Sequence, residues 1–67
     1  MVRNYIVYGV DDKGKLHEVK RTPVAREARI TRDAEKGRWS RVEVFGPDGS
    51  LSVAELNYLS DKGHRYA

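Results

Sequence analysis

The chain must build a stable core from 67 residues without a single cysteine. A chain of this length buries only about 60% of the surface that its unfolded form exposes, and such a core contributes roughly 3–5 kcal/mol of net stability. Disulfides, thiolate metal ligands and a cysteine nucleophile are all excluded. We therefore expect a single small domain over residues 1–67, stabilised by regular local structure and by a partner or a second copy of itself.

The longest apolar run, residues 5–8, is far shorter than the roughly 20 residues that span a bilayer. The first four residues lack the apolar segment of a signal peptide. A cysteine-free chain of this kind fits a reducing compartment, so we expect a cytoplasmic protein.

Two strands and a tight turn are predicted at the N-terminal end. Residues 4–10 are rich in Tyr, Ile and Val, which favour a pleated, half-buried surface. A turn over residues 11–14 follows, in which Gly14 can adopt a positive φ angle. Residues 15–20 then alternate in polarity, and the whole segment predicts a β-hairpin.

One main helix is predicted over residues 23–36. Thr22 and Pro23 are typical of a helix start, and Gly37 is typical of a helix end. At about 100° per residue, small and apolar residues gather on one broad side. We expect this side to face the core: Val24, Ala28, Ile30, Thr31 and Ala34.

Residues 39–45 predict a further strand, and residues 46–49 a turn. Two alternatives remain open after the turn. Leu51 and Val53 fit a fourth strand, whereas Ser52 and Glu55 have the spacing of a capping box. We favour a brief strand near residues 50–52 followed by a short helix to residue 59 that Gly63 ends. Residues 63–67 are expected to fray.

The order of elements is ββαβ followed by a short strand or helix. It predicts an α+β fold, a small antiparallel three- to four-stranded sheet with one main helix packed on one face. The hairpin, the helix and the strand and turn over residues 42–49 loosely resemble short bacterial and phage ββαββ domains. No function is carried over from that resemblance.

Catalytic and metal-binding patterns are absent from the sequence. The two histidines lie far apart and have no ligand-spaced partner. Asp48 and Glu55 match two positions of a calcium loop, but the first and third ligand positions would be Val44 and Gly46. No nucleophile elbow or phosphate-binding loop occurs. We expect neither an enzyme nor a bound cofactor or metal.

Basic residues gather in the middle of the chain. The segment from residue 20 to residue 41 has eight basic and three acidic residues, a formal charge of +5, whereas the rest of the chain carries −2. Helical spacing stacks Arg26, Arg29, Arg32 and Lys36 into a ridge that could follow phosphates. The alternative is an ordinary solvated helix face, because Asp33 lies within the ridge. The candidate anion-binding residues are Lys20, Arg21, Arg26, Arg29, Arg32, Lys36, Arg38 and Arg41.

A second candidate surface is aromatic. If the helix covers the sheet face that bears Val42 and Val44, the opposite face collects aromatic side chains for base stacking or for a protein interface. Its candidate residues are Trp39 and Phe45, joined by Tyr5 or Tyr8 depending on the strand register. A second copy of the chain or its own C-terminal segment could also cover this face.

These observations predict a non-enzymatic binding module. The first hypothesis is association with nucleic acid or a nucleoprotein through the basic helix face. The alternative is a protein–protein interaction module, a small inhibitor, adaptor or regulator of the phage or mobile-element type, or a homodimer. Neither a membrane nor a small-molecule substrate is expected as a partner.

Overall fold

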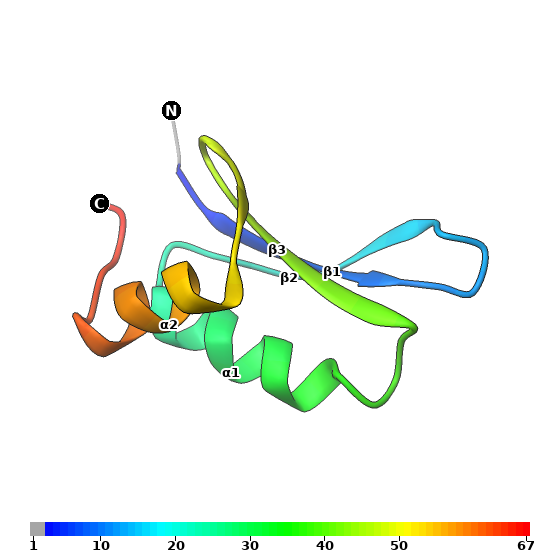
Figure 1. The fold of residues 1–67 in the computed structure, drawn as a ribbon. Coiled ribbons are helices and arrows are strands. Elements are labelled where there is room, and N and C mark those ends of the chain that lie inside the picture. Colours follow the sequence, from blue (N-terminus) through cyan, green and yellow to red (C-terminus); the bar gives the residue numbers. More distant parts are fainter. Residues whose placement is uncertain (1–2) are drawn as a thin grey trace.

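The computed structural model describes residues 3–67 as a four-stranded antiparallel sheet with two helices on one side (Figure 1). The strands are arranged β2-β1-β3-β4. In chain order the elements are β1 (Tyr5–Val10), β2 (Leu16–Thr22), α1 (Ala25–Glu35), β3 (Arg41–Gly46), β4 (Gly49–Leu51) and α2 (Val53–Asp61). The predicted α+β class is confirmed. No helix within residues 3–67 has the length and apolar character needed to cross a membrane.

The β1–β2 hairpin is closed by the side chain of Asp11. Its carboxylate accepts hydrogen bonds from the backbone N–H groups of Lys13 and Lys15, both at 2.9 Å. Gly14 adopts a φ of +82°, which is unfavourable for residues that carry a side chain. The hairpin is therefore confirmed, and β2 extends two residues beyond the predicted strand because its pairing with β1 continues to Thr22.

The register of the central strands decides which residues form the core. β1 and β3 place Val7 directly opposite Val44, and both side chains lie on the face that α1 covers. The prediction that the main helix covers this face is therefore confirmed. The buried core residues are Tyr5, Val7, Ala25, Ala28, Val44 and Leu56.

α1 begins two residues later than predicted. Thr22 is the last residue of β2, and the N-cap residue is Val24, whose side chain makes no capping hydrogen bond. The Thr22 hydroxyl accepts from the Val24 N–H at 3.1 Å and donates to Glu27 at 2.6 Å. Pro23 precedes the helix because Thr22 is still held in the sheet, paired with Tyr5.

α1 also turns a different side to the sheet from the predicted one. Ala25 and Ala28 are fully buried and Arg32 is only 5% exposed, whereas Ile30 is 60% exposed and Ala34 is exposed. The spacing of three and four residues places the buried side chains in one stripe. The predicted side is confirmed for Ala28 and wrong for Ile30 and Ala34. Small alanines allow close approach to the sheet, and this outweighs the apolar character of Ile30.

The segment after β4 forms a helix, so the strand alternative for Val53 is wrong. Ser52 caps α2, since its hydroxyl accepts from the Glu55 N–H at 3.0 Å and the Glu55 carboxylate accepts from the Ser52 N–H at 2.9 Å. The predicted capping box is thus confirmed. α2 ends at Asp61, and Gly63 follows with a φ of +71°.

The C-terminal tail, for which the sequence predicts fraying, makes backbone hydrogen bonds to the start of α1. The Ala25 N–H donates to the carbonyl of His64 at 3.0 Å, and the Tyr66 N–H donates to the carbonyl of Pro23 at 2.9 Å. The Tyr66 ring lies 5.1 Å from that of Tyr5. These contacts supply the backbone partners that a fraying segment lacks.

Candidate binding surface

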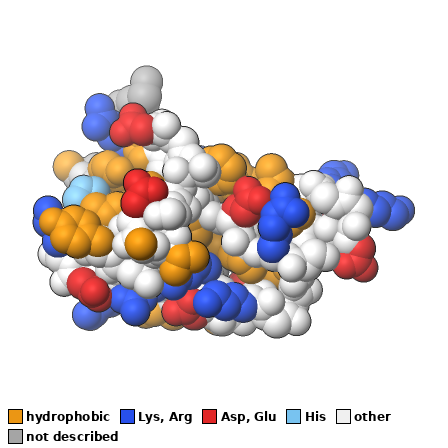
Figure 2. All heavy atoms as spheres, viewed as in Figure 1, with side chains coloured by type: hydrophobic (Ala, Val, Ile, Leu, Met, Phe, Trp, Pro, Cys, Tyr) orange, Lys and Arg blue, Asp and Glu red, His pale blue; other side chains and the backbone are white. Residues whose placement is uncertain are grey.

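Six of the eight candidate anion-binding residues are paired with nearby carboxylates. Lys20 and Arg26 are exposed and have no salt-bridge partner in the described part of the chain. The other six lie 2.7–3.6 Å from an acidic oxygen, in the pairs Arg21–Glu18, Arg29–Asp61, Arg32–Asp33, Lys36–Asp33, Arg38–Glu35 and Arg41–Glu43. Positive and negative side chains are accordingly interspersed over the side seen in Figure 2.

Arg32 does not belong to an exposed basic ridge. Its side chain is only 6% exposed, beneath α2. Nε donates to Asp33 at 3.0 Å, and Nη2 donates to Asn57 of α2 at 2.9 Å. The exposed ridge is therefore reduced to Arg26, Lys36 and the half-buried Arg29. Sequence spacing alone could not detect this, because the covering residue lies 25 positions away.

The sheet face opposite the helices is not covered by any element of residues 3–67. Ile6, Tyr8 and Phe45 alternate with the buried Val7 and Val44, so they point to this uncovered face and are half-buried there. The Tyr8 and Phe45 rings meet edge to face, with centroids 5.5 Å apart. This aromatic pair lies on the two central strands of the sheet.

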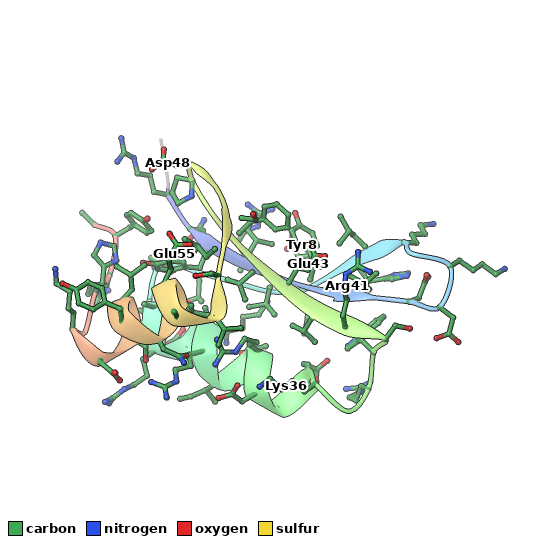
Figure 3. The ribbon with its side chains drawn as sticks, in the orientation of Figure 1. Tyr8, Lys36, Arg41, Glu43, Asp48 and Glu55 are labelled. Carbon is green, nitrogen blue, oxygen red and sulfur yellow. The ribbon has the colours of Figure 1, made fainter. Side chains whose placement is uncertain are left out.

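Ion pairs flank Tyr8 on β2 and on β3. Glu18, opposite Tyr8 on β2, accepts a hydrogen bond from Arg21 at 2.8 Å, and this bond lowers the pKa of the Glu18 carboxyl. Glu43, opposite Tyr8 on β3, accepts from Arg41 at 2.7 Å. Figure 3 shows Tyr8, Arg41 and Glu43 close together, away from Lys36 on α1. Sequence reasoning missed Ile6, Glu18 and Glu43, although strand alternation could have placed them here.

A hollow of about 440 Å³ lies at one end of the uncovered face. It opens between the first residues of β1, the end of β2 and the β3–β4 turn. Its rim carries charges of both signs. The lining residues are Arg3, Asn4, Ile6, Arg21, Gly46, Pro47 and Asp48.

Trp39 lies away from the predicted aromatic face. β3 begins two residues after it, at Arg41, and the indole ring packs over Gly9 on the helix side of the sheet. His17 stacks on the ring with centroids 5.3 Å apart, and Nε1 donates to Glu35 of α1 at 3.1 Å. The prediction was wrong because Trp39 belongs to the α1–β3 connection and not to the alternating strand.

Tyr5 is likewise absent from the uncovered face, because it is fully buried in the core. Its hydroxyl lies 2.6 Å from Nδ1 of His64, within hydrogen-bond distance. Burial, with a contribution from Tyr66, raises the pKa of Tyr5 to about 12, so this hydroxyl stays neutral at physiological pH. Strand alternation places Tyr5 on the same side as Val7.

The titratable side chain of Asp11 serves the β1–β2 turn. Asp11 accepts a hydrogen bond from His17 at 2.8 Å. This bond, together with the N–H groups of Lys15 and Lys13, lowers the pKa of Asp11. Within residues 3–67, no group of three His, Asp or Glu side chains is placed to hold a metal ion.

Comparison with known proteins adds no relative. No protein-family model, curated protein or solved structure was found to match the chain. The resemblance to short ββαββ domains therefore rests on the order of elements alone, and any functional conclusion must come from the chain's own surfaces.

Proposed function

We propose that this protein is a non-catalytic binding module that engages another protein through the uncovered face of its sheet. The observation that carries the proposal is the aromatic pair of Tyr8 and Phe45 at the centre of that face. Arg21 and Arg41 flank it. Aromatic and arginine side chains are enriched in the residues that dominate the binding energy of protein interfaces.

The carboxylates beside this pair favour a protein over a nucleic acid. A phosphate backbone on this face would meet Glu18 and Glu43, and the adjacent arginines are already paired with them. A protein surface can present both signs of charge around an apolar centre. Nucleic acid remains the alternative proposal, supported by the net charge of +3 and by Lys20 and Arg26, which have no salt-bridge partner within residues 3–67.

The area of the uncovered face limits the strength of such a complex. Three strands of six or seven residues and β4 of three residues, about 4.8 Å apart, present roughly 350 Å². Stable complexes bury about 800 Å² on each partner. We therefore expect either a transient complex or a partner that also fills the hollow beside Ile6.

The test measures how substitution of Tyr8 or Phe45 changes the dissociation constant for a partner. A partner would be identified by cross-linking in the source cells, purified and titrated against each variant. Tyr8→Ala or Phe45→Ala should weaken binding roughly 30-fold or more, about 2 kcal/mol. Ile30→Ala, which removes an exposed apolar side chain from α1, is the matched control and should change binding less than about twofold. A partner that binds all three variants equally contradicts the proposal.

Fluorescence anisotropy distinguishes the nucleic-acid alternative from a protein partner. Labelled single-stranded RNA and duplex DNA would be titrated at low and moderate salt, with the label on the nucleic acid because Trp39 lies away from the uncovered face. Saturable binding that weakens steeply with salt and disappears in Lys20→Glu with Arg26→Glu would support the alternative. Absence of binding to either probe favours the protein partner.

A further inference from the structure

A second cavity lies on the helix side of the molecule, between β3, β4 and the first turn of α2. Its volume is about 380 Å³, near the lower end of the roughly 300–1,000 Å³ that small-molecule sites span. Five of its nine lining residues are apolar: Val42, Val44, Leu51, Val53 and Leu56. The remaining lining residues include Arg32, Glu43 and Ser52.

Arg32 lines this cavity, and one nitrogen of its buried guanidinium has no hydrogen-bond partner among residues 3–67. Two of its guanidinium nitrogens are used, since Nε donates to Asp33 and Nη2 donates to Asn57. Nη1 is buried and has no hydrogen-bond partner among residues 3–67. A buried donor without an acceptor costs free energy, so an acceptor that reached this nitrogen from the cavity would be stabilised there.

The start of α2 contributes further donors to the same cavity. Ser52 and Val53 line it, and the N–H groups of the first helical turn have no partner within the helix. The capping box supplies acceptors for the N–H groups of Ser52 and Glu55. It supplies none for the N–H groups of Val53 and Ala54. This helix end favours negative charge through its dipole.

We propose that this cavity binds a carboxylate carried on a small apolar body. The carboxylate accepts from Arg32 at the helix end, and the apolar body packs against Val42, Leu51 and Val53. The carboxylates nearby disfavour a ligand with more than one negative charge. Glu43 is held by Arg41, Asp33 by Arg32, and Glu55 by the capping box, but a phosphate dianion would still be repelled by them.

The site is tested by NMR titration of the ¹⁵N-labelled protein at constant ionic strength. The probes are hexanoate, 1-hexanol, which has the same chain without the charge, and acetate, which has the charge without the chain. We expect saturable shifts at the Val53 and Leu56 amides and at Arg32 Nε with hexanoate, and at least tenfold weaker binding of the other two. Equal affinity for hexanoate and hexanol, or no saturable shift with hexanoate, would overturn the proposal.

Two pairs of variants assign the binding to this cavity. Arg32→Met should abolish the preference for hexanoate over hexanol, while Arg26→Met on the exposed side of α1 retains it. Val53→Asp places a negative charge on an exposed lining residue at the first position of α2, where aspartate suits the helix. It should weaken hexanoate binding at least tenfold relative to Val53→Asn, and this comparison holds even if Arg32→Met does not fold. Equal binding by the two Val53 variants would overturn the proposal.

A titration with a peptide distinguishes the two sources of such a carboxylate, a free short-chain acid and the C-terminus of a protein. Acetyl-Ala-Leu would be compared with its C-terminal amide in the same NMR titration. Tighter binding of the free peptide than of hexanoate would assign the cavity to the chain end of a protein. Weaker binding of the peptide would assign it to a free short-chain acid.

Discussion

Gly9 lacks a side chain at the position that the indole of Trp39 occupies. A Cβ atom built on Gly9 would overlap the ring, which is held from its other sides by His17 and Glu35. The glycine is therefore required by a close approach between two parts of the chain, and its own backbone angles are ordinary. This contact anchors the α1–β3 connection to the sheet.

Gly9→Ala should accordingly destabilise the protein. Overpacking of this kind costs about 1–3 kcal/mol, which urea unfolding followed by Trp39 fluorescence would measure. Gly37→Ala is the control, because a Cβ at Gly37 meets nothing within 4 Å, and it should change the free energy of unfolding by less than about 0.5 kcal/mol. Equal effects of the two substitutions would contradict the packing of Trp39 over Gly9.

Asp11 makes the hairpin sensitive to acid. Hydrogen bonds from His17 and from the Lys15 and Lys13 N–H groups lower its pKa in the folded state. A carboxylate with a depressed folded pKa stabilises the fold above its unfolded pKa, and this stabilisation is lost as pH falls through the folded pKa. The stability contributed by Asp11 should therefore disappear on the acidic side of its ordinary pKa of 3.8.

Asp11→Asn should remove this part of the acid sensitivity. Urea midpoints would be compared from about pH 6 to about pH 2, and the variant should lose less stability on acidification than the unmodified protein. Asp48→Asn, the same chemical change in the exposed β3–β4 turn, serves as the control. A pH profile of Asp11→Asn parallel to that of the unmodified protein would argue against the depressed pKa.

At the scale of elements, the rotation of α1 about its axis determines which basic residues can reach a partner. Ala25, Ala28 and Arg32 face inward, so the exposed positions include Arg26, Ile30 and Ala34. The same rotation places Arg32 under α2 and at the cavity beside β4. A helix turned the predicted way would have kept Arg32 in solvent.

Two alanine-to-leucine substitutions report this rotation directly. Ala28→Leu inserts a larger side chain between α1 and the sheet and should cost about 1–3 kcal/mol in the free energy of unfolding. Ala34→Leu makes the identical change at an exposed position and should stay within about 0.5 kcal/mol. The reverse order in thermal or urea unfolding would mean that α1 packs on its other side.

At the scale of the whole molecule, the fold has only two layers. The shortest principal extent is 15 Å, which accommodates one sheet and one layer of helices. One face of the sheet is thus left open, and the aromatic pair of Tyr8 and Phe45 remains half-buried there. The C-terminal tail closes the covered side by packing beside Tyr5 and the start of α1.

Truncation after Gly63 should therefore destabilise the whole domain. The shortened chain loses the His64 contacts with Ala25 and Tyr5, the Tyr66 hydrogen bond to Pro23, and the apolar cover of the core. Together these amount to about 2 kcal/mol or more, measured by urea unfolding. Removal of Ala67 alone is the control and should leave the midpoint unchanged. A frayed tail would instead make both truncations neutral.

The sequence by itself determined the elements whose signals are local. Asp11 and Gly14 specify a turn by hydrogen bonds and backbone angles within five residues, and Ser52 and Glu55 specify the start of α2 in the same way. The alternation of side chains along β3 places Phe45 on the sheet face opposite the core. These features require only neighbours along the chain, so a pattern of residue types is sufficient to predict them.

Only the tertiary structure decided the positions of Trp39 and Arg32, and with Arg32 the cavity beside β4. Trp39 depends on the space above Gly9, and Arg32 depends on Asn57, which lies 25 residues later in the chain. Each is fixed by contacts between segments far apart in sequence, where packing volume and the pairing of buried polar groups outweigh local preference.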